Sequence, residues 1–378
     1  MSAKTRIFLI ESRAARAPRG GVARYIRHMA EGLHAKYRDR LVVCSRLDDL
    51  PSSMRRLYLP LRYPWRYSSQ LLYEATNGWE RFLLSTVERR LKPDVIFSPL
   101  YGPLTSTTPQ VFTVYDFRLQ IYPDHFEEKG RLLEIEHMKR CFERAYAILS
   151  ISNATKRDLL HLHPNVDEDK VHVVPLGVSE HFFRPSRSVA ATRPYFLFVG
   201  NRSGTKNFLR LLEAFAKSGL ASHYDLRVIS PGLERAGEWS ESEQKVTRSE
   251  NLGKSVKLEV KVSDAQLADA YAGAIGFIFP SEHEGFGLPV LEALASGTVV
   301  ACSNTSSLPE AGGNAAIYFD PAVVEDISKS LVQIAQMDST ERATRIKEGQ
   351  RHAASLSWKE CVDRTCAILE SVASHGTA

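Results

Sequence analysis

Short runs of β-branched and aromatic residues alternate with segments of helical periodicity along most of the chain, and this alternation limits the fold more than any other feature. Strand and helix in alternation predict a parallel sheet with helices on both faces. We expect helices over residues 22–37, 130–144 and 154–162, the last with Asn153 as its N-cap. The strands expected in this half cover residues 6–10, 41–44, 94–98, 111–115, 147–151 and 171–174.

A second series of the same kind follows a stretch without periodicity. Residues 179–194 contain two prolines and are expected to form a linker between domains. The chain then offers strands at 195–199, 224–229, 256–260, 275–279, 298–301 and 316–319, and closing helices at 322–336, 339–355 and 358–373.

The prediction is an α/β fold of two doubly wound, Rossmann-like domains that face each other across a cleft. Such sheets bind ligands at the carboxyl ends of their strands, and here two sets of these ends could face each other. Residues 1–178 form the N-terminal domain and residues 195–357 the C-terminal domain. Residues 358–378 form a C-terminal helix that can pack back on the N-terminal domain.

Composition narrows the class of protein. The chain has 378 residues, of which 43% are hydrophobic and 25% charged, as in folded globular proteins of more than one domain. Its five cysteines are an odd number, spread widely along the chain, and form no C-x-x-C pair, which argues against a disulfide framework and a structural zinc site. The early Glu11 argues against a secretory signal, and no apolar run reaches the ~18 residues of a membrane span. We expect a cytoplasmic enzyme.

The net charge of +5 is unevenly distributed. Residues 1–190 hold 30 Lys and Arg against 21 Asp and Glu, whereas the remainder holds 19 against 23. A basic half indicates an anionic partner, and nucleic acid, a phosphorylated substrate and an anionic membrane surface all qualify.

The most informative segment is FPSEHEGFGLPVLEALASG, residues 279–297. A strand is expected to end at its start, and Pro289 suits the first turn of a helix for which Gly297 is the C′ residue. Backbone N–H groups at such a helix start can hold a phosphate. Glu284 and Glu292 lie eight residues apart, one on the loop and one on the helix, where a carboxylate can accept hydrogen bonds from a vicinal diol. Two solvated glutamates near a buried turn are the alternative.

This segment resembles the E-x7-E signature of the retaining, family-4-type glycosyltransferases with the GT-B fold. The flanking Val262-Ser263-Asp264 and Ser306-Ser307-Leu308-Pro309-Glu310 are also similar to that family. The resemblance implies that Glu284 contacts the hydroxyls of the donor sugar and that Glu292 binds the nucleotide ribose. It also implies that Gly285, Phe286, Gly287 and Leu288 line the donor site.

A second motif, VGNRSGTKN at residues 199–207, lies between an expected strand and an expected helix. Arg202 and Lys206 in a glycine-containing loop make an anion site with fixed cations, which would stabilise the charge on a departing diphosphate. The pair is similar to the phosphate-binding cations of the family, which implies catalytic roles for both. Two surface cations near a helix start are the alternative.

Two weaker motifs lie in the N-terminal half. Gly20-Gly21 precedes a helix without forming G-x-G-x-x-G, so a dinucleotide site is not supported. Its resemblance to the family's glycine loop implies that Gly21 lies near the diphosphate or the acceptor. Many relatives have His-Asp where this chain has Tyr115-Asp116, so the role of that His is not transferred. Asp116 is a candidate to bind the acceptor hydroxyl, or else a structural aspartate.

Residues 54–67, MRRLYLPLRYPWRY, interleave basic and aromatic side chains. This pattern suits the interface of an anionic membrane, single-stranded nucleic acid, or a packed surface excursion. We expect the membrane, since acceptors in the resembled family are often lipid-linked. The residues concerned are Arg55, Arg56, Arg62, Trp65 and Arg66.

The resemblance implies a retaining transfer of a hexose from a nucleotide-diphosphate sugar to a saccharide or lipid-linked acceptor in bacterial polysaccharide synthesis. GDP-mannose is the expected donor and a UDP-hexose the alternative. Fixed cations at the phosphate site would stabilise the leaving group without a metal, so neither a metal nor another cofactor is expected. The rival hypotheses are a sugar-nucleotide epimerase or phosphorylase, a non-catalytic binding protein at a membrane surface, and a nucleic-acid-binding protein, for which no known module is found.

Overall fold

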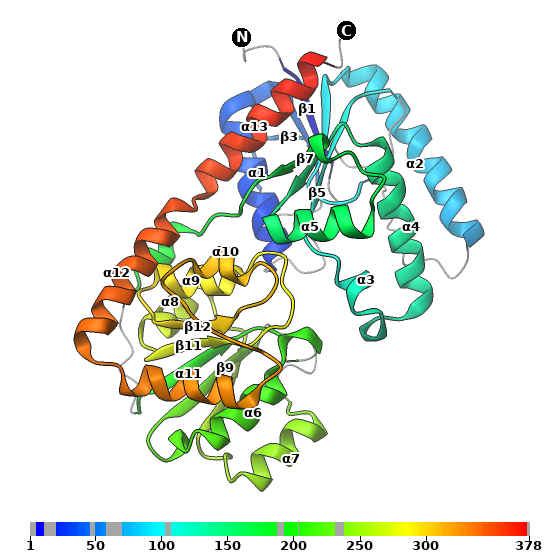
Figure 1. The fold of residues 1–378 in the computed structure, drawn as a ribbon. Coiled ribbons are helices and arrows are strands. Elements are labelled where there is room, and N and C mark those ends of the chain that lie inside the picture. The colour runs from blue at the N-terminus through cyan, green and yellow to red at the C-terminus, as the bar shows by residue number, and fades with distance from the viewer. Residues whose placement is uncertain are drawn as a thin grey trace. The chain divides into compact units, whose positions relative to one another are not determined.

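The chain folds into two compact units, each with its own parallel sheet (Figure 1). The computed structural model describes residues 5–10, 20–45, 50–57, 70–102, 107–186, 193–202, 204–230 and 238–375. The first unit comprises Met1–Leu176 together with Trp358–Ala378, and the second comprises Gly177–Ser357.

The sheet of the first unit has seven strands in the order β3-β2-β1-β4-β5-β6-β7, all paired in parallel. The strand order reverses between β1 and β4, so ligands of this sheet are expected at the carboxyl ends of these two strands. Most of these strands are short apolar runs with every residue buried, as is usual for a sheet covered on both faces. The strands are β1 (Ile7–Ile10), β2 (Leu41–Cys44), β3 (Arg55–Arg56), β4 (Val95–Ser98), β5 (Gln110–Val114), β6 (Ala147–Ser150) and β7 (Val171–Val173).

Helices connect these strands. Asn153 was expected to cap the helix after β6, and this prediction is wrong by one residue: the Ser152 side chain accepts a hydrogen bond from the Thr155 amide at 3.0 Å. Ser152 keeps the extended backbone of the strand end, which is the conformation that an N-cap needs. The helices are α1 (Gly21–Tyr37), α2 (Gln70–Leu91), α3 (Arg118–Ile121), α4 (Glu128–Arg144), α5 (Asn153–Leu162) and α13 (Trp358–His375).

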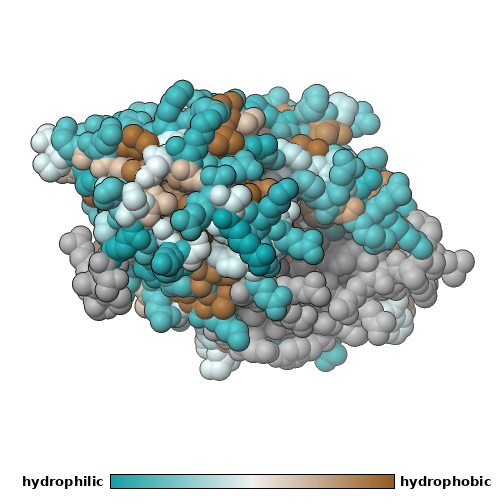
Figure 2. All heavy atoms as spheres, turned by 90° about the horizontal axis from the view of Figure 1, so that it is seen from below, coloured by the Kyte–Doolittle hydropathy of each residue, from teal (hydrophilic) through white to brown (hydrophobic). Residues whose placement is uncertain are grey.

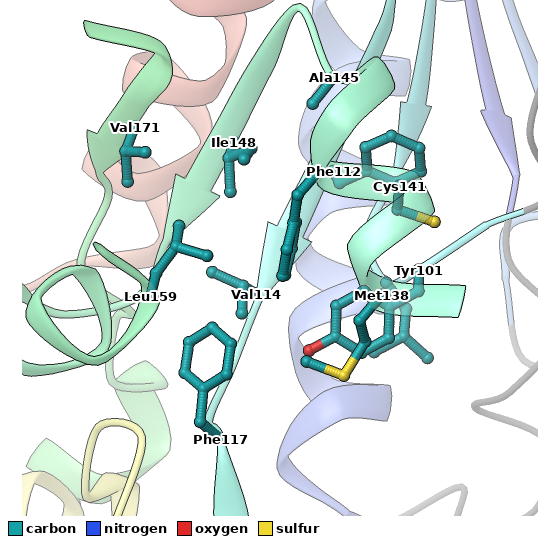
Figure 3. Packing of buried hydrophobic residues seen from close by; sticks show 12 residues of the cluster. Tyr101, Phe112, Val114, Phe117, Met138, Cys141, Ala145, Ile148, Leu159 and Val171 are labelled. Carbon is teal, nitrogen blue, oxygen red and sulfur yellow. The ribbon is translucent and has the colours of Figure 1, made fainter. Parts of the chain in front are cut away.

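An apolar core joins the sheet of the first unit to α4 (Figure 3). Met138 and Cys141 lie one helical turn apart, so α4 presents both to the core. Phe112 and Val114 are two residues apart in β5 and therefore share one face of the sheet. Burial of a large apolar side chain such as Phe112 stabilises a fold by about 1.5–3 kcal/mol.

The C-terminal helix α13 packs against α1 within the first unit. Gly32 of α1 permits the close approach, because a Cβ at this position would lie 2.6 Å from both Cγ atoms of Val362. The Tyr37 hydroxyl at the end of α1 donates a hydrogen bond to Glu370 at 2.6 Å. Because Gly32 carries only a hydrogen atom in place of a Cβ, α13 can pack closely on α1.

The second unit has a six-stranded parallel sheet in the order β10-β9-β8-β11-β12-β13. Its strand order reverses between β8 and β11. The two parallel sheets confirm the predicted α/β class, and every strand expected from the sequence is present with ends within two residues of the prediction. The strands are β8 (Tyr195–Val199), β9 (Asp225–Ser230), β10 (Val256–Val260), β11 (Gly276–Phe279), β12 (Val300–Ser303) and β13 (Ile317–Phe319).

Helix starts in the second unit carry clear capping signals. Ser240 and Ser263 each accept a hydrogen bond from the backbone three residues later, and Glu243 and Gln266 return the bond, which makes two capping boxes. The helices are α6 (Phe208–Lys217), α7 (Glu241–Ser249), α8 (Asp264–Ala272), α9 (Leu288–Ala295), α10 (Leu308–Gly312), α11 (Val324–Gln336) and α12 (Ser339–Ser355).

Part of the predicted linker, 179–194, is folded. Glu180–Phe183 form a 3-10 helix, and Phe182 is fully buried with its ring 6.0 Å from that of Tyr271 in α8. This part therefore belongs to the second unit. A lone turn has no periodicity, so its burial leaves no pattern in the sequence.

The surface drawn in Figure 2 is mostly hydrophilic, and its apolar side chains form small separate patches. Such patches are ordinary for a water-exposed surface. Along the described ranges, no helix combines the length and apolarity that crossing a bilayer requires.

Gly32→Ala should lower the free energy of unfolding of the first unit by about 1–3 kcal/mol, because the added methyl group overlaps Val362 and forces α13 away from α1. Chemical denaturation followed by circular dichroism measures this change. Gly253→Ala is the control, since a Cβ there has no neighbour within 4 Å, and it should change stability by less than about 0.5 kcal/mol. Equal stability of both variants would contradict the close packing of α13.

Candidate functional site

Two loops of the second unit meet where its strand order reverses. Residues 200–207 follow β8 and residues 280–287 follow β11, and the two strands are hydrogen-bonded neighbours. Ligands of open α/β sheets bind at such a reversal, outside the carboxyl ends of the strands. The sequence placed its two strongest motifs on these loops, and the structure brings them together.

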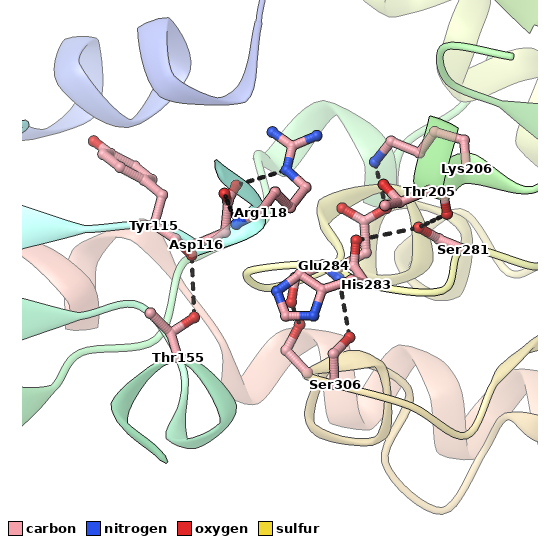
Figure 4. Close-up of polar contacts among 11 residues, drawn as sticks. Tyr115, Asp116, Arg118, Thr155, Thr205, Lys206, Ser281, His283, Glu284 and Ser306 are labelled. Carbon is pink, nitrogen blue, oxygen red and sulfur yellow. Dashed lines mark hydrogen bonds and ion pairs between the residues drawn. The ribbon is translucent and has the colours of Figure 1, made fainter. Parts of the chain in front are cut away.

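Lys206 and Glu284 are in direct contact in this site (Figure 4). The Lys206 ammonium donates to Oε1 of Glu284, and the two side chains are only 17% and 13% exposed. The same ammonium lies 5.5 Å from the centre of the Phe279 ring, at cation–π range. A cation and a carboxylate are therefore held together in a partly desolvated place.

Backbone hydrogen bonds join the two loops. The carbonyl of Thr205 accepts one bond from the Glu282 amide at 2.7 Å and another from the Ser281 hydroxyl at 3.1 Å. These bonds set Lys206, the next residue, beside the loop that carries Glu284 (Figure 4).

The loop after β12 holds Glu284 from the other side. The Glu284 amide donates to the Ser306 hydroxyl at 2.9 Å, and the Ser307 hydroxyl donates to the Glu284 carbonyl at 2.8 Å. Both backbone groups of Glu284 are thus bound by side chains, which leaves its carboxylate as the part that can turn. The SSLPE segment singled out in the sequence contains both serines.

Unusual backbone conformations gather around the site. Asn207 and Ser306 have positive φ angles of 57° and 50°, which non-glycine residues adopt only at a cost. Gly287, with φ of 106°, is the N-cap of α9. Its Cβ would lie 2.8 Å from Leu308 and 3.2 Å from Ala311, so this position needs glycine for both conformation and space.

The start of α9 supplies backbone donors beside the ion pair. Gly285 and Phe286 are buried, and Leu288 opens the helix. Pro289 has no N–H, and the amides of Val290 and Leu291 donate to the Gly287 carbonyl, so the amides placed to bind an anion are those earlier in the chain, up to Leu288. The expected C′ residue, Gly297, is confirmed by its φ of 79° after Ser296.

Glu292, the second glutamate of the predicted motif, lies in α9 and is only 4% exposed. Its Oε2 accepts a hydrogen bond from the Tyr271 hydroxyl at 3.3 Å. A carboxylate can accept several hydrogen bonds at once, so it can bind more than one donor.

Arg202 has a glutamate partner of its own. Its guanidinium is paired with Glu243 of α7 at 2.8 Å, donates to the Glu238 carbonyl, and lies 4.8 Å from the centre of the Trp239 ring. Arg202 and Glu243 are 9% and 7% exposed. The structure therefore assigns this guanidinium to fastening α7 to the loop after β8.

Sequence reasoning missed Glu243 and Trp239. The signal for Glu243 is the S-x-x-E spacing of Ser240 and Glu243 before a helical segment, which predicts a capping box. The ion pair of Glu243 with Arg202 could not be predicted, because Arg202 lies 41 residues earlier in the chain.

In the first unit, Tyr115 and Asp116 follow β5. The Asp116 carboxylate pairs with the Arg118 side chain at 3.1 Å and also accepts from the Arg118 amide at 3.1 Å (Figure 4). The Tyr115 hydroxyl donates to the Pro99 carbonyl at 2.5 Å. Tyr115, at the position to which no His role was transferred, therefore has a hydroxyl that is already hydrogen-bonded.

The other predicted residues of the first unit are partly described. Gly21 is the first residue of α1, after the strand β1 at the reversal of that sheet. Arg55 and Arg56 form the short strand β3, and Arg56 donates to the Leu50 carbonyl. The other residues of the proposed membrane segment, Arg62, Trp65 and Arg66, lie outside the described residues.

Thiol and metal chemistry have little support in the described residues. All five cysteines are free and buried, and burial raises the thiol pKa of Cys141, of Cys302 and of Cys361, the last to about 12. Such thiols are protonated and unreactive at neutral pH. Within the described ranges, His, Cys, Asp and Glu side chains form no group of three that could hold a metal ion.

Two family models match the chain. "Glycosyltransferase Family 4" covers residues 19–182, and "Glycosyl transferases group 1" covers residues 179–353. O-antigen chain mannosyltransferase B of Escherichia coli is 30% identical over 267 residues, which is 68% of each chain. The chain belongs to the family-4 glycosyltransferases.

Other comparisons agree on family and fold. O-antigen chain mannosyltransferase RfbU of Salmonella typhimurium is 28% identical over 60% of this glycosyltransferase, which spans 61% of that relative's length. The solved sucrose-phosphate synthase of Thermosynechococcus elongatus superposes with a TM-score of 0.77 at 18% identity, covering 98% of this chain and all of that one. The fold of this glycosyltransferase is therefore GT-B, as the resemblance implied, and the prediction that it is an enzyme is confirmed.

Gly287→Ala should destabilise this glycosyltransferase more than Gly219→Ala does. Both glycines have positive φ, which costs alanine about 1–2 kcal/mol, but only Gly287 has neighbours where the methyl group would go. The steric overlap should add about 1–3 kcal/mol. Thermal unfolding of the two variants measures the difference, and equal losses would show that the space around Gly287 is not needed.

Glu243→Gln should lower the free energy of unfolding by about 3 kcal/mol, because it leaves the buried Arg202 guanidinium without its counter-charge. Gln still suits the capping box, so the helix start is retained. Glu241→Gln, on the exposed side of the same first turn, is the matched control and should be within about 0.5 kcal/mol of the parent. A stable Glu243→Gln protein would mean that Arg202 has another anchor.

Proposed function

We propose that this enzyme transfers a hexose from a nucleotide-diphosphate sugar, GDP-mannose, to a glycan or lipid-linked saccharide in the synthesis of a bacterial surface polysaccharide. The names of the two relatives described above, both O-antigen chain mannosyltransferases, support the sugar and the pathway. The structural observation that best supports this proposal is the contact of Lys206 with Glu284 beside the start of α9. A UDP-hexose donor is the alternative.

In this proposal the donor binds to the second unit. The Lys206 ammonium and the amides at the start of α9, at Gly285 to Leu288, bind the diphosphate. Glu284 accepts hydrogen bonds from the sugar hydroxyls, and Glu292 accepts them from the ribose diol. The burial of Glu292 supports its role, because a carboxylate away from water prefers a ligand that can donate two hydrogen bonds.

The chemistry requires no nucleophile from the protein. The bond between the anomeric carbon and the phosphate oxygen breaks while the acceptor oxygen bonds to the same carbon from the same face, so the configuration is retained. The acceptor proton passes to the departing phosphate oxygen, which gains negative charge. Lys206 and the helix amides stabilise that charge without a metal ion, as preorganised donors do in other phosphate sites.

Arg202 was expected to bind the diphosphate together with Lys206. To do so, its guanidinium would have to break its contacts with the buried Glu243 carboxylate, the Glu238 carbonyl and the ring of Trp239. We therefore propose that Lys206 is the cation that contacts phosphate, and that Arg202 supports the loop.

The first unit is proposed to bind the acceptor. Asp116 is the candidate for the acceptor hydroxyl, because its carboxylate remains 24% exposed beside Arg118. Gly21 is proposed to let the start of α1 approach an anionic group of either substrate. Arg55 and Arg56 at the sheet edge are proposed to face an anionic membrane on its cytoplasmic side, and the free cysteines are typical of that compartment.

A thermal-shift comparison with GDP, UDP, ADP and dTDP, without metal, tests the donor site. A nucleotide at 100 times its Kd should stabilise the protein by about 2.7 kcal/mol. We expect GDP to stabilise the parent protein, and Lys206→Gln or Glu292→Gln to lose most of that shift. Lys217→Gln, which removes a surface lysine paired with Glu325, should keep it.

Other outcomes have definite meanings. A shift with UDP alone keeps the enzyme class and replaces the sugar. A full shift in a folded Lys206→Gln protein rules out Lys206 as the phosphate cation. Transfer to an acceptor that needs added Mg²⁺ would contradict the metal-independent chemistry.

A further inference from the structure

Lys206, the cation that the proposed function assigns to the diphosphate, already has a partner. In the described structure the Lys206 ammonium is already neutralised by Glu284. Both side chains are more than four-fifths buried, so the attraction between them is screened less than between exposed groups. A diphosphate that takes Lys206 must displace this carboxylate.

The neighbouring cations are paired in the same way. Arg202 bonds Glu243 at 2.8 Å, and Arg210 bonds Glu282 at 2.9 Å. Each cation described in the stretch from the end of β8 to the first turn of α6 thus has a carboxylate partner. Glu282 and Glu284 lie on the same loop, but only Glu284 reaches the lysine.

The surroundings let the Lys206–Glu284 pair open without moving the chain. Ser306 and Ser307 hold the amide and the carbonyl of Glu284, and the Thr205 carbonyl is held by two donors just before Lys206. Only side-chain rotation is needed to separate the two charges, and such rotation is fast.

We propose that Glu284 is an internal competitor for Lys206 that distinguishes the sugar-nucleotide donor from the nucleoside diphosphate product. The inference rests on the proposed function. With the donor bound, sugar hydroxyls donate to the Glu284 carboxylate and draw it away from Lys206, which is then available to the phosphates. After transfer the sugar is absent, and the carboxylate returns to Lys206 and expels the diphosphate.

The competition follows from the charges. A carboxylate only accepts hydrogen bonds and repels phosphate, whereas neutral hydroxyls satisfy it without adding charge. A residue that only binds the sugar hydroxyls would tighten the binding of the donor and leave the binding of the nucleoside diphosphate unchanged. A competitor weakens the binding of a ligand that lacks the sugar.

Calorimetric titration with GDP and with UDP tests the inference on the whole chain. Glu284→Gln keeps the size of the side chain and removes its charge, so it should bind the nucleoside diphosphate about tenfold more tightly than the parent, a change of about 1.4 kcal/mol. Glu282→Gln removes the neighbouring carboxylate paired with Arg210 and should stay within about twofold. Glu284→Asp, whose carboxylate is one methylene shorter, serves if the Gln variant does not fold, and should tighten binding by a smaller factor.

Equal or weaker binding of the diphosphate by Glu284→Gln would overturn the inference. If the parent binds the diphosphate and Lys206→Gln weakens it, while Glu284→Gln leaves it unchanged, the proposed donor site stands and the competition is wrong. If neither GDP nor UDP binds the parent or any variant, both the proposed function and the competition are wrong.

Discussion

The carbonyl oxygen of Thr205 receives two hydrogen bonds from the loop after β11, and the position of the whole site depends on this join. It sets Lys206 against Glu284, while Ser306 holds Glu284 from the far side. Because β8 and β11 are neighbours at the reversal of the sheet, their loops leave the sheet side by side. The positive φ angles of Asn207 and Ser306 are the local cost of this arrangement.

Charge pairing is the second organising feature of the second unit. Arg202, Lys206 and Arg210 each carry a glutamate partner, yet the pairs differ in exposure. The Arg202 pair is the most buried and ties α7 to the loop after β8, whereas the Lys206 pair lies beside the start of α9. A family-4 glycosyltransferase must hold a polyanionic donor and then let the product go, and a cation with an internal competitor suits both needs.

The sequence could predict much of the fold and part of the site. Strand and helix positions followed from periodicity, because short buried runs in a parallel sheet leave a clear pattern. The Phe182 turn and the Ser152 cap were missed, since single residues leave no periodic signal. Of the predicted cation pair, Lys206 contacts Glu284 of the E-x7-E segment, but Arg202 contacts a helix that the sequence had not marked.

By itself, then, the sequence determined the class of the two sheets, the motifs at the strand ends and the family, because these depend on residues close together in the chain. Tertiary structure alone decided which charges meet. Glu284 contacts a lysine 78 positions earlier, and Arg202 contacts Glu243 rather than an open site. Such partners are chosen by the order of strands in the sheet and by the loops that neighbouring strands present, and neither is a property of local sequence.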